Sequence, residues 1–242
     1  MISTTAHGPV TLLTLQRPER RNALDLELCR ALRDHVTAAH EDGARAIVVT
    51  GEGTGFCAGA DLDGVYGEEF IEALYGMLAT VREVPVPVVA AVNGPAIGAG
   101  TQLALACDLR VAAPTARFGV PTARNGLAVD TWTMRTLAEV AGGGVARRLM
   151  IGAELVDADA ALACGLADRA GDLDDALAWA AQLATFAPLT LAYNKLVLNS
   201  DPADVDANAR IDAGWQACWA SDDVREAQAA RSEKRTPVFH GR

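Results

Sequence analysis

Two glycine-rich segments are the parts of this sequence best suited to chemistry through the main chain. The first, GEGTGFCAGADL, spans residues 51–62, and the second, NGPAIGAGTQ, spans residues 93–102. Glycine and alanine let a bound molecule approach the backbone closely, and the second segment leads into a helix whose dipole favours negative charge. Two backbone N–H groups aimed at one carbonyl oxygen form an oxyanion hole. Glycine-rich turns also serve chain reversal alone, so either segment taken singly is a weak indication.

The residue types that support other common chemistries are missing from these segments. Gly98-Ala99-Gly100 lacks the third glycine of the G-x-G-x-x-G dinucleotide motif, and G-K-[ST] follows neither segment. The sequence has no G-x-S-x-G, which disfavours a nucleophile-elbow hydrolase. The five cysteines lack C-x-x-C spacing, and the four histidines leave a long middle without imidazole. We therefore expect neither a disulfide framework nor a metal site.

Length and charge narrow the classes of protein and ligand. The chain has 242 residues, 50% of them hydrophobic, which is enough for one sizeable core. A net charge of −10 disfavours binding to nucleic acid and to anionic membranes. The N-terminus does not resemble a signal peptide and no apolar run is long enough to span a membrane, so we expect a soluble, cytoplasmic protein. An anionic ligand would need local basic clusters, although such clusters can also be solvated surface charge. The two clusters are Arg17, Arg20 and Arg21, and Arg231, Lys234 and Arg235.

The elements that must position the glycine-rich segments are a strand before each and a helix after the second. Alternation and β-branched runs predict strands at 10–15, 45–50, 88–93 and 108–113. Helical spacing predicts helices around 28–39, with Gly43 as the C-terminal cap, and at 68–82, 101–106 and 131–140, with 118–130 as a loop. Alanine-rich helices follow at 157–164, 174–186, 189–198 and 222–235. This order predicts an α/β core with a C-terminal helical extension.

Several motifs, in the right order, resemble the enoyl-CoA hydratase/isomerase, or crotonase, superfamily over nearly the whole chain. They are QRPERRNAL (16–24), GFCAGADL (55–62), PVVAAVNGPAIGAG (87–100), ACDLRVAA (106–113) and EAQAARSEKRTPVF (226–239). The resemblance implies an α/β crotonase (ClpP/crotonase-like) fold, with a spiral core of β-β-α repeats at residues 1–187 and a C-terminal helical region for trimerisation at 188–242. It also implies a homotrimer or a dimer of trimers. The expected ligand is the acyl-CoA thioester of fatty-acid metabolism, with coenzyme A part of the substrate and no separate cofactor.

The resemblance also assigns residues to a site. It places the oxyanion-hole N–H groups at Ala58 and Ala99. The remaining substrate-binding positions that it implies are Arg20, Arg21, Ala23, Ala60, Asp61, Leu62, Gly98 and Lys234, the last reaching CoA phosphates. Asp61 follows a turn and precedes apolar residues, so a role as a helix N-cap is an alternative that does not exclude contact with the ligand.

The sequence departs from the family's hydratases at both catalytic glutamates. Gln102 stands at the first position and Thr122, in FGVPT, at the second. Neither an amide nor an aliphatic hydroxyl titrates near neutral pH. Because each lost acid or base typically costs about 10²- to 10⁴-fold in rate, we expect weak or absent hydratase activity.

Two further residues keep alternative functions open. Asp130 matches the place where some isomerases of the superfamily carry a catalytic aspartate, and it is equally well placed to cap a helix beginning at Thr131. Gln102, Thr122 and the GLA-x-D-x-W pattern also resemble a mycolic-acid-associated, acyl-CoA-binding branch, in which Trp132 would form a wall of the acyl channel or belong to the core. The hypotheses are therefore a weak hydratase/isomerase, a non-catalytic acyl-CoA carrier feeding fatty-acid elongation, and a structural protein without a ligand.

Overall fold

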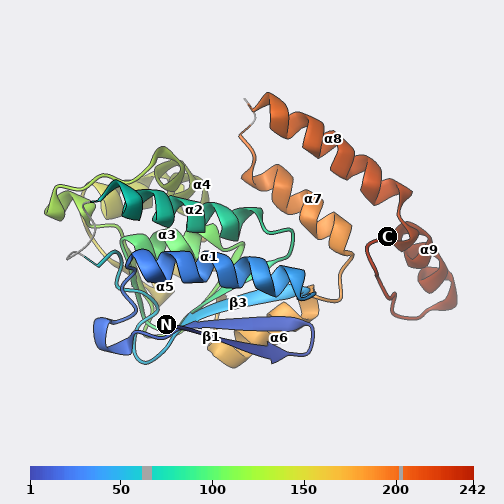
Figure 1. Cartoon of the computed structure of the whole chain (residues 1–242), viewed down its shortest axis with the longest axis horizontal. Helices are drawn as coiled ribbons and strands as arrows, with labels where there is room; N and C mark the ends of the chain where they lie inside the picture. Colours follow the sequence, from blue (N-terminus) through green and yellow to red (C-terminus); the bar gives the residue numbers. More distant parts are fainter. Residues whose placement is uncertain (62–66, 202–203) are drawn as a thin grey trace.

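A twisted, mostly parallel sheet forms the centre of the molecule. The computed structural model describes residues 1–61, 67–201 and 204–242 (Figure 1). The sheet has the strand order β1-β2-β3-β4-β6-β9. Its strands are β1 (Ile2–His7), β2 (Val10–Leu15), β3 (Ala46–Gly51), β4 (Val88–Val92), β6 (Leu109–Ala112) and β9 (Arg169–Ala170). β1 and β2 form an antiparallel hairpin, and β2, β3, β4, β6 and β9 pair in parallel. The carboxyl ends of the parallel strands therefore meet at one edge, and both glycine-rich segments begin there.

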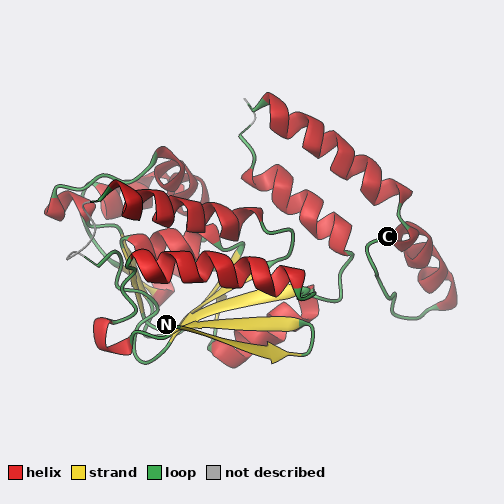
Figure 2. Ribbon diagram, in the orientation of Figure 1, coloured by secondary structure: helices red, strands yellow, loops and turns green. Residues whose placement is uncertain are grey.

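Helices cover both faces of this sheet, which explains why β3 and β4 consist almost entirely of apolar residues. Every residue of β3 and of β4 is buried, as expected for parallel strands covered on both sides (Figure 2). On one face, Ile47 and Val49 of β3 belong to a hydrophobic core that they share with α1 (Leu26–Glu41), α2 (Glu68–Glu83) and α3 (Ala99–Ala106). On the other face, Val48 and its neighbours pack against α6 (Leu173–Leu183).

A second, smaller sheet connects the glycine-rich segments to the rest of the fold. It has the order β5-β7-β8, with β5 at Pro95–Ile97, β7 at Arg117–Gly119 and β8 at Val156–Asp157. The sequence predicted a turn at 93–100 and a loop at 118–130, and no strand was expected at β1. The structure corrects these points: β5 and β7 are three residues each and pair in parallel within the small sheet, while β1 pairs with β2 although most of its residues are exposed.

The remaining helices continue the chain beyond the sheets. Two short 3₁₀ turns are η1 (Pro18–Arg20) and η2 (Thr122–Asn125). The later helices are α4 (Thr131–Met150), α5 (Ala158–Cys164), α7 (Pro188–Asn199), α8 (Val205–Ala220) and α9 (Asp222–Glu233). α7 and α8 form a hairpin that extends away from the sheet, and α9 lies at its far end (Figure 1). Among the described residues, no single helix is apolar and long enough to cross a membrane; α6 and α7 meet that criterion only as a pair bent by 111°.

One buried lysine fastens α7 to the core. Lys195 Nζ lies 2.7 Å from Asp108 Oδ2 and donates to the carbonyl oxygens of Val81 and Val86, each at 3.0 Å. Burial raises the pKa of the Asp108 carboxyl, and the charge of Lys195 opposes that shift. The ion pair thus joins α7, the end of α2 and the start of β6 at one point.

We expect Lys195→Met to lower the free energy of unfolding by about 3 kcal/mol, because removal of one partner leaves the other buried and uncompensated. Urea unfolding of both proteins measures this difference. Glu154→Gln, which breaks the exposed Arg148–Glu154 pair, is the matched control and should change stability by less than about 1 kcal/mol. Equal effects of the two substitutions would contradict the role given to Lys195.

Candidate functional site

The two glycine-rich segments meet where β3 and β4 end. The Cys57 N–H donates to the Pro95 carbonyl oxygen at 3.1 Å, and the Ile97 N–H donates to the Cys57 carbonyl oxygen at 2.9 Å. A Cβ at Gly100 would lie 2.1 Å from the Cys57 oxygen, and a Cβ at Gly59 would lie 2.6 Å from the Ile97 oxygen. Glycine is therefore required at both positions for the segments to approach this closely.

We expect Gly100→Ala to prevent this approach and to lower the melting temperature strongly, by about 10 °C or more if the clash costs several kcal/mol. Gly144→Ala is the control, because a Cβ at Gly144 meets nothing within 4 Å and alanine favours its helix. Thermal unfolding followed by circular dichroism compares the two. A Gly100→Ala protein as stable as the Gly144→Ala protein would show that the segments do not need this contact.

The backbone N–H groups at this junction that have no acceptor among the described residues include two on facing segments. One is that of Ala60, whose neighbours Gly59 and Asp61 instead bond to Leu24, with N···O distances of 2.7 and 2.8 Å. The other is that of Ala99, the first residue of α3, where intrahelical acceptors are lacking by geometry. A Cβ at Gly59 would lie 3.6 Å from the Ala99 nitrogen, so the two groups belong to segments in near contact.

The expectation for Ala58 is wrong. Its N–H donates to the Arg21 carbonyl oxygen at 2.9 Å and so is not available to a ligand. Arg21 itself has a φ of 51°, in the left-handed region, and this conformation turns its carbonyl toward the loop. The donor that the first segment offers is that of Ala60, two residues further on.

The Arg-rich motif at 16–24 lies directly against the first glycine-rich segment. Asn22 is fully buried, and its side-chain amide donates to the carbonyl oxygens of Glu52 and Gly55 at 2.9 and 2.8 Å. Arg17 forms ion pairs with Asp61 at 3.3 Å and with Asp25 at 2.9 Å.

These contacts place the residues that the resemblance assigned to CoA binding. Arg21 bonds to Ala58 and Leu24 bridges Ala60, and the Arg17 side chain that pairs with Asp61 also donates to the Ala23 carbonyl oxygen. Arg20 and Arg21 are exposed, whereas Ala23 is buried. Gly98, with a φ of 55°, directly precedes the Ala99 N–H. The remaining assignment, Leu62, lies outside the described residues. Asp61 was also a candidate helix N-cap. Its carboxylate pairs with Arg17, and the N-cap of α2, which begins at Glu68, is Gly67.

The two residues at the glutamate positions have different surroundings. Gln102 lies on α3 with only 2% of its surface exposed, and its Nε2 donates to Thr133 Oγ1 at 2.8 Å. Thr122 opens η2 and is half-buried, and its carbonyl oxygen accepts the Leu127 N–H at 3.1 Å. Neither an amide nor an aliphatic hydroxyl titrates near neutral pH, so neither side chain acts as an acid or a base there.

Asp130 caps α4, as one of the two interpretations of the sequence predicted. Its Oδ1 accepts the Thr133 N–H at 3.2 Å and forms a further, short hydrogen bond with Thr133 Oγ1. Its own N–H donates to the Tyr75 hydroxyl oxygen at 3.1 Å. One carboxylate oxygen is thus committed to the cap.

Trp132 is half-buried, in agreement with its predicted place in the core, and its role as a wall of an acyl channel stays a prediction. It packs against the main core, and the Arg82 guanidinium lies 4.3 Å from its ring centroid. The ring also lines a cavity of about 810 Å³ between α4 and α7. Burial lowers the pKa of Arg82, and its Nε is sealed from solvent without a partner among the described residues.

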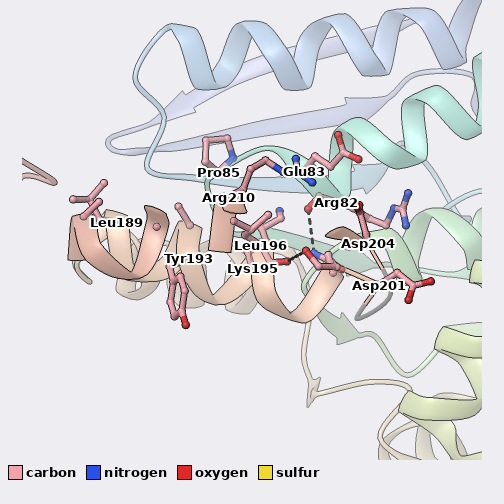
Figure 3. A pocket seen from close by; sticks show the side chains of 15 residues that line it. Arg82, Glu83, Pro85, Leu189, Tyr193, Lys195, Leu196, Asp201, Asp204 and Arg210 are labelled. Carbon is pink, nitrogen blue, oxygen red and sulfur yellow. Dashed lines mark hydrogen bonds between the residues drawn. The ribbon is translucent and has the colours of Figure 1, made fainter. Parts of the chain in front are cut away.

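A smaller cavity of about 350 Å³ lies between the end of α2, α7 and α8 (Figure 3). Its lining includes Arg82, Tyr193, Lys195 and Arg210. None of the predicted site residues is among the described residues that line it.

Lys234 lies away from these N–H groups in its own chain. It follows α9 with a φ of 55°, and the tail beyond it contacts the opposite edge of the sheet, where Arg45 Nη1 donates to the Phe239 carbonyl oxygen at 3.2 Å. Arg45 precedes β3, whereas the glycine-rich segments follow β3 and β4. The structure therefore does not bring Lys234 and Ala60 of one chain together.

The cysteines near the site are not suited to nucleophilic chemistry. Burial raises the pKa of Cys29, Cys57 and Cys107 to about 12 in each case. Thiolates are the reactive form, so these residues behave as small apolar groups. Within the described residues, no group of three or more His, Cys, Asp or Glu side chains is arranged to hold a metal ion.

The chain belongs to the enoyl-CoA hydratase/isomerase family, whose model matches residues 5–242. It is 48% identical to "Probable enoyl-CoA hydratase echA6" of Mycobacterium tuberculosis, over 100% of both chains. It is 31% identical to the crotonyl-CoA hydratase of Syntrophomonas wolfei, over 95% of this chain and 94% of that protein.

Solved structures agree with this assignment. An enoyl-CoA hydratase/carnithine racemase from Magnetospirillum magneticum matches with a TM-score of 0.88 and 30% identity, over 100% of this chain and 96% of that one. An enoyl-CoA hydratase from Polaromonas matches with a TM-score of 0.88 and 34% identity, over 99% of both chains. The predicted crotonase fold is thereby confirmed.

Proposed function

We propose that the protein binds acyl-CoA thioesters and polarises their carbonyl through the N–H groups of Ala60 and Ala99. The observation that carries this proposal is the presence of these two donors, without described acceptors, on segments in near contact. The thioester oxygen supplies the acceptor that both groups lack. The positive end of the α3 dipole at Ala99 adds to the same effect.

Hydration of an enoyl thioester needs proton transfers that Gln102 and Thr122 do not perform. Of the steps that the family's hydratases perform, this protein keeps the binding of the thioester and the polarisation of its carbonyl. We therefore propose a protein of fatty-acid metabolism with weak or absent hydratase activity, acting as a carrier that presents acyl-CoA for chain elongation. Asp130 is the one group considered for a residual isomerase activity, and its role as the cap of α4 argues against free proton exchange.

We also propose that the functional unit is a homotrimer, or a dimer of trimers, built through α7–α9. Trp215 and Trp219 are 52% and 65% exposed on α8, more than is usual for side chains of this size in a monomer. Because Lys234 lies far from Ala60 in its own chain, its contact with CoA phosphates is assigned to the site of a neighbouring subunit.

Incubation of the purified protein with 2- and 3-enoyl-CoA thioesters, followed by mass spectrometry, tests the proposal. Saturated acyl-CoA binding is measured by calorimetry in parallel, with a two-glutamate hydratase as the control for turnover. Binding without product supports a carrier. Hydration at the control's rate would contradict it, isomerised product would assign Asp130 as a base, and failure of every acyl-CoA to bind would favour a structural protein.

A further inference from the structure

The Asn22 side chain joins the Arg-rich motif to the first glycine-rich segment. Asn22 is fully buried, and its Nδ2 donates to the carbonyl oxygens of Glu52 and Gly55 at 2.9 and 2.8 Å. Its Oδ1 accepts the Arg17 N–H at 3.0 Å. Two carbonyl oxygens on one side and an N–H on the other fix the orientation of the amide. Both amide hydrogens and the amide oxygen are therefore used to hold main chain to main chain.

The backbone at Asn22 forms a turn that few residue types adopt readily. Arg21 and Asn22 have φ values of 51° and 57°, in the left-handed region, which asparagine enters more easily than most residues. The Asn22 N–H donates to the Arg17 carbonyl oxygen at 2.8 Å and closes the turn. Asparagine thus suits both the turn and the hydrogen bonds that attach the turn to the first glycine-rich segment.

The chain that leaves this turn pairs with the first glycine-rich segment and sets the direction of a free donor. Leu24 forms a parallel bridge to Ala60: the Leu24 N–H donates to the Gly59 carbonyl oxygen at 2.7 Å, and the Leu24 carbonyl oxygen accepts the Asp61 N–H at 2.8 Å. In such a ladder, the residue between the two bonded neighbours turns its own N–H to the opposite side. The Ala60 N–H therefore points away from Leu24.

We infer that Asn22 is a positioning residue for the Ala60 N–H, and through it for the polarisation of the thioester carbonyl. This inference rests on the proposed function. By attaching the turn to residues that follow β3, Asn22 fixes Leu24 against Ala60. A donor must be held in a fixed direction to stabilise charge on an oxygen. Loss of the amide leaves the Arg17–Asp61 ion pair to keep the motif and the segment together, so the Ala60 N–H loses its direction while the CoA-binding surface remains.

The infrared carbonyl stretch of bound acyl-CoA, isotope-labelled at the thioester carbonyl, tests the inference. A hydrogen bond to the carbonyl oxygen lowers this frequency, so we expect binding to the natural protein to lower it. Asn22→Gly keeps the left-handed backbone accessible but removes all three side-chain hydrogen bonds, and it should lose most of the shift. Lys195→Met, which lowers stability away from both glycine-rich segments, is the control and should keep the shift.

Calorimetry gives a second measurement on the same proteins. The preference for acyl-CoA over a thioether analogue that lacks the carbonyl should fall about three- to tenfold in Asn22→Gly, the range of one net hydrogen bond. Should Asn22→Gly fail to fold, Asn22→Asp has the same size and places a carboxylate against the two carbonyl oxygens. It should lose the infrared shift at neutral pH and regain part of it in acid, because a protonated carboxyl supplies one donor.

The outcomes separate the two proposals. A full shift in folded Asn22→Gly, or in Asn22→Asp at neutral pH, would overturn the role of Asn22 and leave the proposed function intact. A folded variant that loses the thioether analogue together with the thioester would also overturn it, because Asn22 would then support the CoA-binding surface as a whole. An unshifted carbonyl in the natural protein would instead overturn the proposed function.

Discussion

Substituting glutamate for both Gln102 and Thr122 is expected to create a hydratase at least about 10²-fold faster than the natural protein, because each acid or base contributes about 10²- to 10⁴-fold. The fold and the two N–H donors are already in place, so the missing part is proton transfer. Each single variant supplies one of the two groups and should gain much less than the pair. Release of 3-hydroxyacyl-CoA from 2-enoyl-CoA, followed by mass spectrometry, gives the rates.

The hydrogen-bond path at Gln102 limits this gain in a predictable way. A carboxylate at position 102 would face Thr133 Oγ1, whose single proton is already donated to Asp130. Adding Asp130→Asn removes the competing carboxylate and keeps a good N-cap, since asparagine caps helices as well as aspartate does. We expect the triple variant to exceed the double variant. A natural protein that already matches a two-glutamate hydratase would refute the premise of all three substitutions.

The elements that the sequence predicted correctly are those with strong local patterns. Residues 68–82 were expected to be helical, and α2 occupies Glu68–Glu83; residues 45–50 were expected as a strand, and β3 occupies Ala46–Gly51. Asp130 was weighed equally as a cap and as a base, and the structure shows the cap. β5 was missed because a three-residue strand has no periodicity of its own and depends on its pairing with β7 and with Cys57, both distant in the sequence.

The errors in the site come from contacts between distant residues. The choice of Ala58 over Ala60 depends on which N–H the Arg21 carbonyl accepts, and Arg21 is 37 residues before Ala58 in the chain, so local sequence cannot reveal it. Thr133 was not identified at all, because its bond to Gln102 spans 31 residues between two helices. The place of Lys234 likewise depends on how α9 packs, which composition does not determine.

Replacing Ala99 with proline is expected to weaken acyl-CoA binding by about tenfold or more, the equivalent of about 1.4 kcal/mol. Proline removes the N–H that the thioester oxygen would use and puts a methylene group in its place. The substitution suits the backbone, because Ala99 is the first residue of α3, where proline is favoured and no intrahelical bond is lost. Gly98 precedes it with ψ at −118°, outside the helical region that a following proline disfavours.

Val205→Pro is the matched control for this change, since it places proline at the first position of α8, an exposed site remote from both glycine-rich segments. It should bind acyl-CoA as the natural protein does.

A thioether analogue of acyl-CoA, which lacks the carbonyl, gives a second comparison that needs no variant. The natural protein should bind the thioester more tightly than the thioether, and Ala99→Pro should lose most of that difference. If the natural protein bound both ligands equally, the N–H groups of Ala60 and Ala99 would not form an oxyanion hole, and the affinity would come from the CoA and acyl portions alone.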